Sequence, residues 1–467
     1  MREDAMDGSQ SINPYLTGNF APIAGEDDFD LEVVGEIPVG LAGALYRNGP
    51  NPQFTPRGDY YWFGGDGMIH GFFVDDARVR YRNRYIRTPK WSAENAAGRS
   101  LFGLFGNPMT TDPSVLTTDS GVANTNILWH AGRLMALEEG HKPFEIDPRT
   151  LESRGYADEY RGRVTAHPKI DPETGEMTWF GYSTGEAPLN STVSYGVTDA
   201  GGTVTRRDDF EAPYSSMIHD FMVTKGHVLF PILPLTGSLQ RAMTGGPAYA
   251  WEPEKGAFVG VMARDAGVET IRWFETAACY VFHPMNAWED GDRIFADVME
   301  YETAPLFPNA DGSRNEDRGA RLVRWTIDLA GATDQIKREP LNDLAGEFPR
   351  FDERRAGLSY RHGWFAGNSG RLGGFGFDTI AHIDLATGRR LAHHLPMGDA
   401  TGEPIFVPRS SDAPEGDGWV ISVVYRGEED RSDFLIFDAQ DLPAGPIATA
   451  QMPRRVPFGF HGNWRAA

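Results

Sequence analysis

Cysteine is nearly absent from this chain, since Cys279 is the only one among 467 residues. An intramolecular disulfide is therefore excluded, and so are zinc or iron–sulfur sites built from several cysteine thiolates. Long apolar runs are absent as well. The longest, His227–Leu235, is interrupted by two prolines and is far too short to span a bilayer.

Basic residues are scarce relative to acidic ones. There are 44 Lys and Arg against 66 Asp and Glu, which gives a net charge of −22. This balance argues against nucleic acid as a partner and allows at most a peripheral contact with anionic lipid. The segment Met1–Thr17 is polar and acidic, without the basic and apolar regions of a signal peptide. We therefore expect a cytoplasmic protein.

Amphipathic helical patterns are few, and Ala93–Leu104 and Leu235–Met243 are the best candidates for short helices. Short runs with strand character are common and are separated by glycine and proline, which are frequent at 54 and 32 residues. We predict strands at Val79–Tyr85, Leu134–Leu137, Met177–Tyr182, Val228–Ile232, Arg293–Val298, Arg321–Ile327 and Trp419–Tyr425.

These predicted hairpins run along the whole chain without a linker or a break in composition. We therefore expect a single all-β domain over residues 1–467, and we favour a propeller over a barrel or a sandwich. Internal repeats are too weak to give the number of blades. Seven blades would have about 67 residues each, well above the usual ~40–45, so long insertions would form a cap over one face.

Four of the twelve histidines share a local setting, in which apolar or small residues precede a histidine at a turn or strand. They are His167, His219, His283 and His461. They are far apart in the sequence, so each must come from a different supersecondary unit, and a propeller brings such units to a common axis. A single histidine in an apolar setting is more often a hydrogen-bonded core residue. The pattern alone therefore leaves a metal site and four core residues both open.

Three glutamates, Glu139, Glu347 and Glu403, lie in apolar or proline-bounded contexts. An ordinary surface carboxylate is the usual role of a glutamate. The functional alternative is a carboxylate that accepts the remaining N–H of a metal-bound imidazole, which fixes the tautomer of the ring and raises its basicity. Four neutral imidazoles would leave the +2 charge of a metal uncompensated, so nearby carboxylates would suit such a site.

Several further motifs occur together with these residues: Tyr46-Arg-Asn-Gly-Pro-Asn-Pro52, Gly64-Gly-Asp-Gly-Met68, Ala123-Asn-Thr-Asn126, Glu347-Phe-Pro-Arg350, Glu403-Pro-Ile-Phe-Val-Pro408 and His461-Gly-Asn-Trp464. In this combination the chain resembles the carotenoid cleavage oxygenases. These are iron enzymes that split the double bonds of carotenoids, apocarotenoids, stilbenes and phenylpropenes. The resemblance covers nearly the whole chain.

The resemblance implies a seven-bladed β-propeller with a cap of loops and short helices over an Fe(2+) centre. It implies that the four histidines are the iron ligands, that Glu139 supports His219, and that His167 alone lacks a carboxylate partner. In the same way Glu347 would support His283 and Glu403 would support His461. Thr125 would crowd one open coordination position. The implied partners are a small apolar alkene and O2, and no catalytic residue is implied beyond the metal centre. The oligomeric state is left open.

The substrate is less sharply indicated. The stilbene- and phenylpropene-cleaving branch is similar over long stretches, and Phe63, which stacks on an aromatic ring in that branch, is kept. The lysine and tyrosine that bind a phenol oxygen there are replaced here by Glu138 and Phe105, so a phenolate would meet a carboxylate. We therefore expect a carotenoid or apocarotenoid substrate, with a stilbene or phenylpropene as the alternative. Two further hypotheses are an isomerase on the same iron site and a non-catalytic binding propeller.

Overall fold

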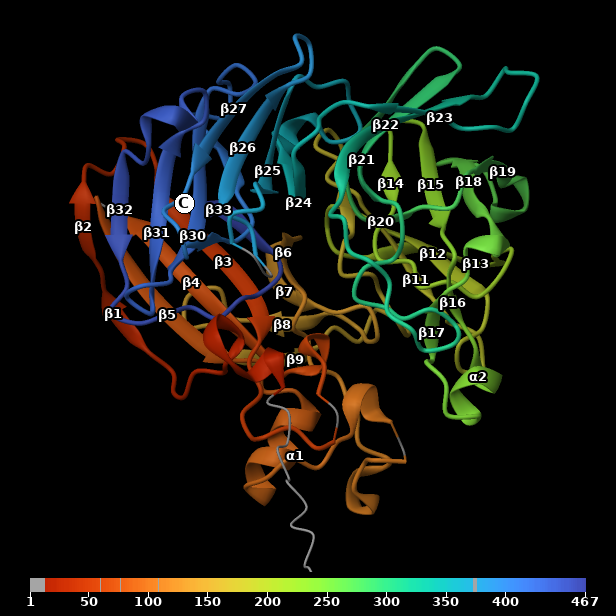
Figure 1. Ribbon diagram of the computed structural model, residues 1–467, viewed down its shortest axis with the longest axis horizontal. Coiled ribbons are helices and arrows are strands. Elements are labelled where there is room, and N and C mark those ends of the chain that lie inside the picture. The colour runs from red at the N-terminus through yellow and green to blue at the C-terminus, as the bar shows by residue number, and fades with distance from the viewer. Residues whose placement is uncertain (1–12, 59, 76, 108, 373–375) are drawn as a thin grey trace, which may run out of the picture.

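Seven antiparallel sheets are arranged as the blades of a β-propeller in the computed structural model (Figure 1). The model describes residues 13–467 except 59, 76, 108 and 373–375. The prediction of an all-β, seven-bladed propeller is confirmed. Part of the segment in which we expect no signal peptide, residues 1–12, lies outside the described residues. No helix in the described part of the chain is long and apolar enough to cross a membrane.

Five blades are four-stranded meanders of consecutive elements, apart from one small hairpin insertion. The first two comprise β6 (Asn126–His130), β7 (Arg133–Leu137), β8 (Phe144–Ile146) and β9 (Ser153–Tyr156), then β10 (Lys169–Ile170), β11 (Met177–Tyr182), β12 (Thr192–Thr198) and β13 (Val204–Glu211). The third comprises β14 (Met222–Val223), β15 (His227–Ile232), β18 (Ala257–Ala263) and β19 (Arg272–Thr276), with the hairpin β16 (Leu235–Gly237) and β17 (Tyr249–Trp251) inserted.

The fourth and fifth blades follow in the same way. They comprise β20 (Tyr280–Asp290), β21 (Arg293–Tyr301), β22 (Arg321–Asp328) and β23 (Lys337–Pro340), then β24 (Ala345–Phe351), β25 (His362–Asn368), β26 (Thr379–Asp384) and β27 (Arg389–His394). The first strands of neighbouring blades contact one another, as β14 with β20 and β20 with β24. These first strands therefore surround the axis of the propeller.

The two ends of the chain close the ring. In one blade β33 (Gly462–Ala466) pairs with the N-terminal β3 (Gly43–Pro50), with Leu45 opposite Trp464, and the order continues through β4 (Gly67–Asp75), β5 (Arg78–Tyr85) and β1 (Asp28–Asp30). In the other, β2 (Glu32–Gly35) pairs with β32 (Ala448–Gln451), followed by β31 (Arg431–Asp438), β30 (Gly418–Arg426), β28 (Ala400–Thr401) and β29 (Ile405–Pro408). Pairing of the termini leaves no gap between the first and last blades.

All seven strands predicted from the sequence are present, with bounds that agree within a few residues. The helix predictions need correction. The first helix, α1, is Pro89–Ala97 rather than 93–104, because Thr88 caps its N-terminus, proline occupies its first position, and Gly98 ends it in a left-handed conformation. The second, α2, is Leu239–Met243, since residues 235–237 form a strand. Helix α1 and its loops lie beyond one end of the blades (Figure 1).

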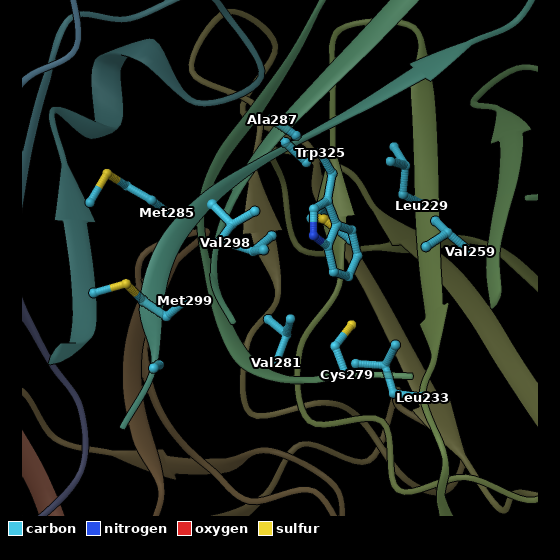
Figure 2. Packing of buried hydrophobic residues seen from close by; sticks show 14 of the residues in the cluster. Leu229, Leu233, Val259, Cys279, Val281, Met285, Ala287, Val298, Met299 and Trp325 are labelled. Carbon is cyan, nitrogen blue, oxygen red and sulfur yellow. The ribbon is translucent and has the colours of Figure 1, made fainter. Parts of the chain in front are cut away.

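Packing between neighbouring blades provides the core. Figure 2 shows Trp325 of β22 flanked by Leu229 and Val259 of the preceding blade and by Val298 of its own blade. All four of these side chains are fully buried. Burial of each large apolar side chain contributes about 1.5–3 kcal/mol. Because each blade shares such contacts with its neighbours, the relative positions of the strands near the axis are well determined.

We expect Leu229→Ala to lower the free energy of unfolding by about 2–5 kcal/mol, because it leaves a cavity between two blades. Leu239→Ala on α2 is the matched control. Leu239 is 41% exposed, so its truncation should change the stability by no more than about 0.5 kcal/mol. Chemical denaturation followed by tryptophan fluorescence measures both. Equal effects of the two substitutions would contradict the assigned core.

Candidate metal centre and substrate cavity

Four histidines meet at the axis on one face of the propeller. His167 and His219 lie shortly before the first strands β10 and β14, His283 lies within β20, and His461 directly precedes β33. Their side chains belong to four different blades, and the residues are 5–9% exposed. The candidate ligand atoms of the four all lie within 4.8 Å of one another. The structure thus brings together the four histidines selected from the sequence.

The facing nitrogens are spaced like neighbouring ligands of one metal ion. Nε2 of His219 lies 3.1 Å from Nε2 of His167 and 3.0 Å from Nε2 of His283. Two ligands at right angles, each about 2.1 Å from a metal, would be about 3.0 Å apart. The arrangement therefore leaves room for an ion between the rings.

Each of the three predicted glutamates accepts a hydrogen bond from the far nitrogen, Nδ1, of one histidine. Glu139 accepts from His219, Glu347 accepts from His283 at 2.5 Å, and Glu403 accepts from His461 at 3.0 Å. A proton held at Nδ1 leaves the Nε2 lone pair free to bind a cation. The three glutamates come from the three blades that supply no histidine, so each of the seven blades contributes one residue.

Irregular strand pairing aims two of these side chains at the axis. In β20 the register shifts on both sides of Pro284, next to His283. In β24 it shifts after Glu347, and the following Phe348 has a φ of +54°. A β-bulge turns a side chain away from the regular alternation of a strand. His283 and Glu347 can therefore form their hydrogen bond across the boundary between these two blades.

His167 has no carboxylate in direct hydrogen-bond contact, but one lies behind it. Oδ2 of Asp220 is 3.8 Å from Nδ1 of His167, which is too long for a hydrogen bond. Lys169 pairs with both oxygens of Asp220, at 2.7 and 2.9 Å. The Asp220–Lys169 pair is close to neutral, so it supports His167 less directly than the glutamates support the other rings.

Burial and the neighbouring rings favour the neutral form of two of the histidines, His167 and His283. Burial, followed by the charges that the other three histidines would carry, lowers the pKa of His167 well below its ordinary value. Burial also lowers the pKa of His283, with His461 and His219 acting in the same direction. Neutral imidazole is the form that binds a metal. His167 and His283 are therefore held in the form that can bind a cation.

The carboxylates behind the rings differ in their charge environment. Burial acts to raise the pKa of Glu403, but Arg350 at 3.2 Å and the hydrogen bond from His461 outweigh it and lower the pKa to about 2. Burial raises the pKa of Glu347 well above its ordinary value, and the backbone N–H of Phe348 only partly opposes this. A bound divalent ion would favour the charged form of both. Four convergent lone pairs backed by carboxylates fit a divalent transition metal, with the four Nε2 atoms as its ligands.

A cavity of about 710 Å³ opens over the histidines. This volume is within the usual range for small-molecule sites. Its lining includes three of the four histidines, the residues Thr125, Phe63, Phe105 and Glu138 singled out from the sequence, and many aromatic rings. The aromatic members of the lining are Phe54, Tyr60, Trp62, Phe63, Phe102, Phe105, Tyr182, Tyr249, Phe282, Tyr301, Phe307, Phe348, Phe377 and Phe460.

The four pocket residues have different positions in this cavity. Thr125 immediately precedes β6, and its carbonyl accepts the backbone N–H of His461. Phe63 packs against Phe460 with ring centroids 5.1 Å apart. Phe105 is 67% exposed, in a left-handed backbone conformation, so it lies at the rim. Glu138 is bound to backbone N–H groups and to a histidine, which the sequence alone did not indicate.

Several residues of the centre were not selected from the sequence. Asp220 directly follows His219, and Arg350 closes the Glu347-Phe-Pro-Arg350 motif, so their positions beside selected residues were a usable signal. Tyr182, which donates to Glu139 at 2.5 Å, and His141, which pairs with Glu138, carried no such signal. Both come close to the site only through folding.

Seven blades around four histidines and three carboxylates, beneath an aromatic cavity, define a metal-centred β-propeller. The family model described as retinal pigment epithelial membrane protein matches residues 20–466. The chain belongs to the family of that protein and the carotenoid cleavage oxygenases. It is therefore an enzyme of the alkene-cleaving, non-haem iron oxygenase class.

Individual relatives are similar over nearly the whole chain. An isoeugenol monooxygenase of Pseudomonas putida is 41% identical over 97% of this chain and 98% of its own length. A carotenoid cleavage oxygenase of Mycobacterium tuberculosis is 34% identical over 98% of each chain. The crystal structure of a lignostilbene dioxygenase from Pseudomonas brassicacearum matches with a TM-score of 0.93 at 33% identity, over 97% of this chain and 98% of that one.

We expect Glu347→Gln to weaken metal binding about 10- to 100-fold, because an amide is a poorer acceptor for Nδ1–H of His283 than a carboxylate. Competition with a chelator of known affinity measures the change. Glu289→Gln is the matched control: Glu289 accepts from Nδ1 of His227 at 2.6 Å, in the same kind of pair but away from the cavity. Equal metal affinity of the two variants would contradict the role of Glu347.

Proposed function

We propose that this protein is an Fe(2+)-dependent dioxygenase that cleaves the carbon–carbon double bond of a small aromatic alkene, a phenylpropene or a stilbene, into two carbonyl compounds. The observation that carries this is the group of four convergent Nε2 atoms, three of them backed by carboxylates, at the end of an aromatic cavity. The reaction balances as one alkene plus one O2 giving two carbonyl products, so no external reductant is needed.

His167, His219, His283 and His461 would hold the ferrous ion. Four imidazoles would leave a bound ferrous ion able to take small exogenous ligands as well. When bound, the iron supplies the ability to activate O2 in the presence of the alkene. Thr125 lies in the cavity wall beside His461 and would restrict access on that side.

The aromatic residues that line the cavity would orient the substrate and keep water away from it. The rings of Phe63 and Phe460 lie side by side in the cavity lining and offer a surface for an aromatic ring. Stacked or edge-on contacts between such rings contribute about 0.5–1.5 kcal/mol beyond the buried area. An alkene held rigidly near the metal reacts faster than a free one because its orientation is already determined.

The comparisons favour an aromatic alkene over the carotenoid that we expect from the sequence. Identity is 41% to a protein named for isoeugenol and 34% to one named for carotenoid cleavage. The physical reason for preferring a carotenoid was that Glu138 and Phe105 replace the phenol-binding lysine and tyrosine, so that a phenolate would meet a carboxylate. In the structure this carboxylate is paired with His141, so that reason is much weaker.

The test is oxygen uptake by the iron-loaded protein with isoeugenol, a hydroxystilbene and an apocarotenal, with the products identified by mass. We expect one O2 consumed per alkene, an aromatic aldehyde as product, and turnover at least about tenfold faster with an aromatic alkene than with the apocarotenal. A preference for the apocarotenal would restore the carotenoid assignment. Isomerisation without oxygen uptake would indicate an isomerase, and a protein that binds no iron would indicate a binding propeller.

Substitution of one histidine tests the centre directly. We expect His219→Ala to abolish oxygen uptake, because it removes a ligand that neighbours two others. His227→Ala is the control, since His227 is also paired with a glutamate but does not line the cavity. It should keep at least about half of the activity. Retained oxygen uptake in His219→Ala would exclude this metal centre.

A further inference from the structure

Helix α1 and the chain that follows it lie beyond one end of the blades and form part of the cavity wall (Figure 1). Leu101 and Phe102 pack there in a small apolar cluster that is separate from the clusters of the blades. Phe102 lines the cavity, as do Lys90 and Glu94 of the helix. The seven residues of the metal centre all lie elsewhere in the chain, so this wall can affect the substrate without contacting the metal.

Lys90 of α1 lies between two buried carboxylates. Its Nζ is 2.6 Å from Oδ1 of Asp66 and 2.9 Å from Oε2 of Glu94. Lys90 is 9% exposed, and each of the two acidic residues is 2% exposed. Burial acts to lower the pKa of Lys90, but Asp66 and then Glu94 outweigh it and raise the pKa. Lys90 therefore carries its positive charge between the two carboxylates at neutral pH.

These three side chains connect a blade to the wall of the cavity. Asp66 directly precedes β4, and its second oxygen, Oδ2, accepts a backbone N–H at 3.1 Å. The second oxygen of Glu94, Oε1, accepts the backbone N–H groups of Leu101 at 2.7 Å and Phe102 at 3.0 Å. A continuous chain of hydrogen bonds to charged groups thus runs from the start of β4 through Lys90 and Glu94 to the wall.

The physical effect of such a cluster is on position more than on stability. A buried ion pair contributes little net stability, because the loss of hydration offsets most of the attraction. Its geometry is nevertheless narrow, since a buried charged group is satisfied only where its partners are. Nζ of Lys90 also lies 5.9 Å from the centroid of the Phe102 ring. Lys90 therefore determines where Oε1 of Glu94 lies, and Oε1 determines where the wall lies.

We propose that Asp66, Lys90 and Glu94 are positioning residues that hold the backbone of Leu101 and Phe102 in the cavity wall, and thereby strengthen the binding of the substrate. Loss of this cluster would release the wall and weaken substrate binding, with little change in iron binding or in the chemical step. The inference goes beyond the proposed function, because it concerns the wall of the cavity for any small alkene that binds there.

Lys90→Met tests whether Lys90 acts through Glu94. An ammonium group is only a donor, so Lys90 cannot accept the N–H groups of Leu101 and Phe102. We nevertheless expect these two amides to exchange with solvent at least about tenfold faster in the variant. The KM for isoeugenol should rise about tenfold with kcat within about twofold, the pattern of lost binding. Iron affinity, measured by competition with a chelator, should be unchanged.

The matched control is Lys142→Met. Lys142 pairs with Asp158 at 2.7 Å, where the Asp158 side chain is 88% exposed, and it does not line the cavity. This variant should keep the wild-type KM and the wild-type exchange rates of Leu101 and Phe102. Chemical denaturation followed by tryptophan fluorescence checks that both lysine variants are folded.

Glu94→Gln is a second variant that leaves the Lys90–Asp66 pair in place, so no buried carboxylate of the cluster loses its cation. An amide has one acceptor oxygen, which can serve either Lys90 or the two backbone N–H groups, but not both. We expect its KM to rise at least about fivefold with kcat within about twofold. Glu145→Gln is its control, because Glu145 pairs with Arg133 and does not line the cavity.

The double variant Lys90→Met/Glu94→Gln tests whether the two residues act through one chain of contacts. Its KM should lie within about twofold of that of Lys90→Met. Effects that multiply would overturn the proposal, and so would unchanged KM and exchange rates in both single variants, or a loss confined to kcat. If the wild type takes up no oxygen with isoeugenol, the proposed function fails, and the exchange rates of Leu101 and Phe102 alone decide this proposal.

Discussion

The hydrogen bond between a buried glutamate and the far nitrogen of a histidine in another blade is the interaction on which the site depends. Each such bond holds a proton at Nδ1, and this leaves Nε2 as an acceptor aimed at the axis. Without it an imidazole could turn its N–H inward, and the ring would not bind a cation. The bonds at His219, His283 and His461 also tie pairs of blades together at the point where the ring of sheets is narrowest.

This arrangement buries several ionisable groups, which would be costly without compensation. The buried carboxylates Glu403 and Glu347 are compensated to different extents. Glu403 has Arg350 at 3.2 Å, while the raised pKa of Glu347 reflects burial, which the hydrogen bonds from the Phe348 backbone and from Tyr301 only partly oppose. A divalent ion bound by the four rings would offset the remaining negative charge. Metal binding and the stability of the blade boundaries are therefore expected to be coupled.

The same stretch of chain serves the metal centre and the cavity. Strand β7 ends at Leu137, and because a turn follows, Glu138 and Glu139 both line the cavity instead of alternating as they would in a strand. One carboxylate is used to hold a ligand ring, and the other presents an unpaired oxygen. The metal centre and the wall of the cavity are thus joined through a single peptide bond.

Much of the fold and of the metal centre could be predicted from the sequence, because these features depend on local sequence patterns. Short strands between glycine and proline breaks gave the all-β class, and shared local settings together with the family motifs selected the four histidines and three glutamates. The position of α1 was predicted wrongly, although Thr88, Pro89 and Gly98 carry the capping signals that determine it. Those signals are local, so this error was avoidable.

Other features could not be predicted, because they depend on residues that only folding brings together. The near-neutral Asp220–Lys169 pair behind His167, the ion pair of Glu138 with His141, and the bulges that aim His283 and Glu347 are of this kind. Sequence alone determined which side chains are available for a metal site. The tertiary structure decided which carboxylate lies behind each histidine and which groups pair with each charge, since these follow from distances between blades.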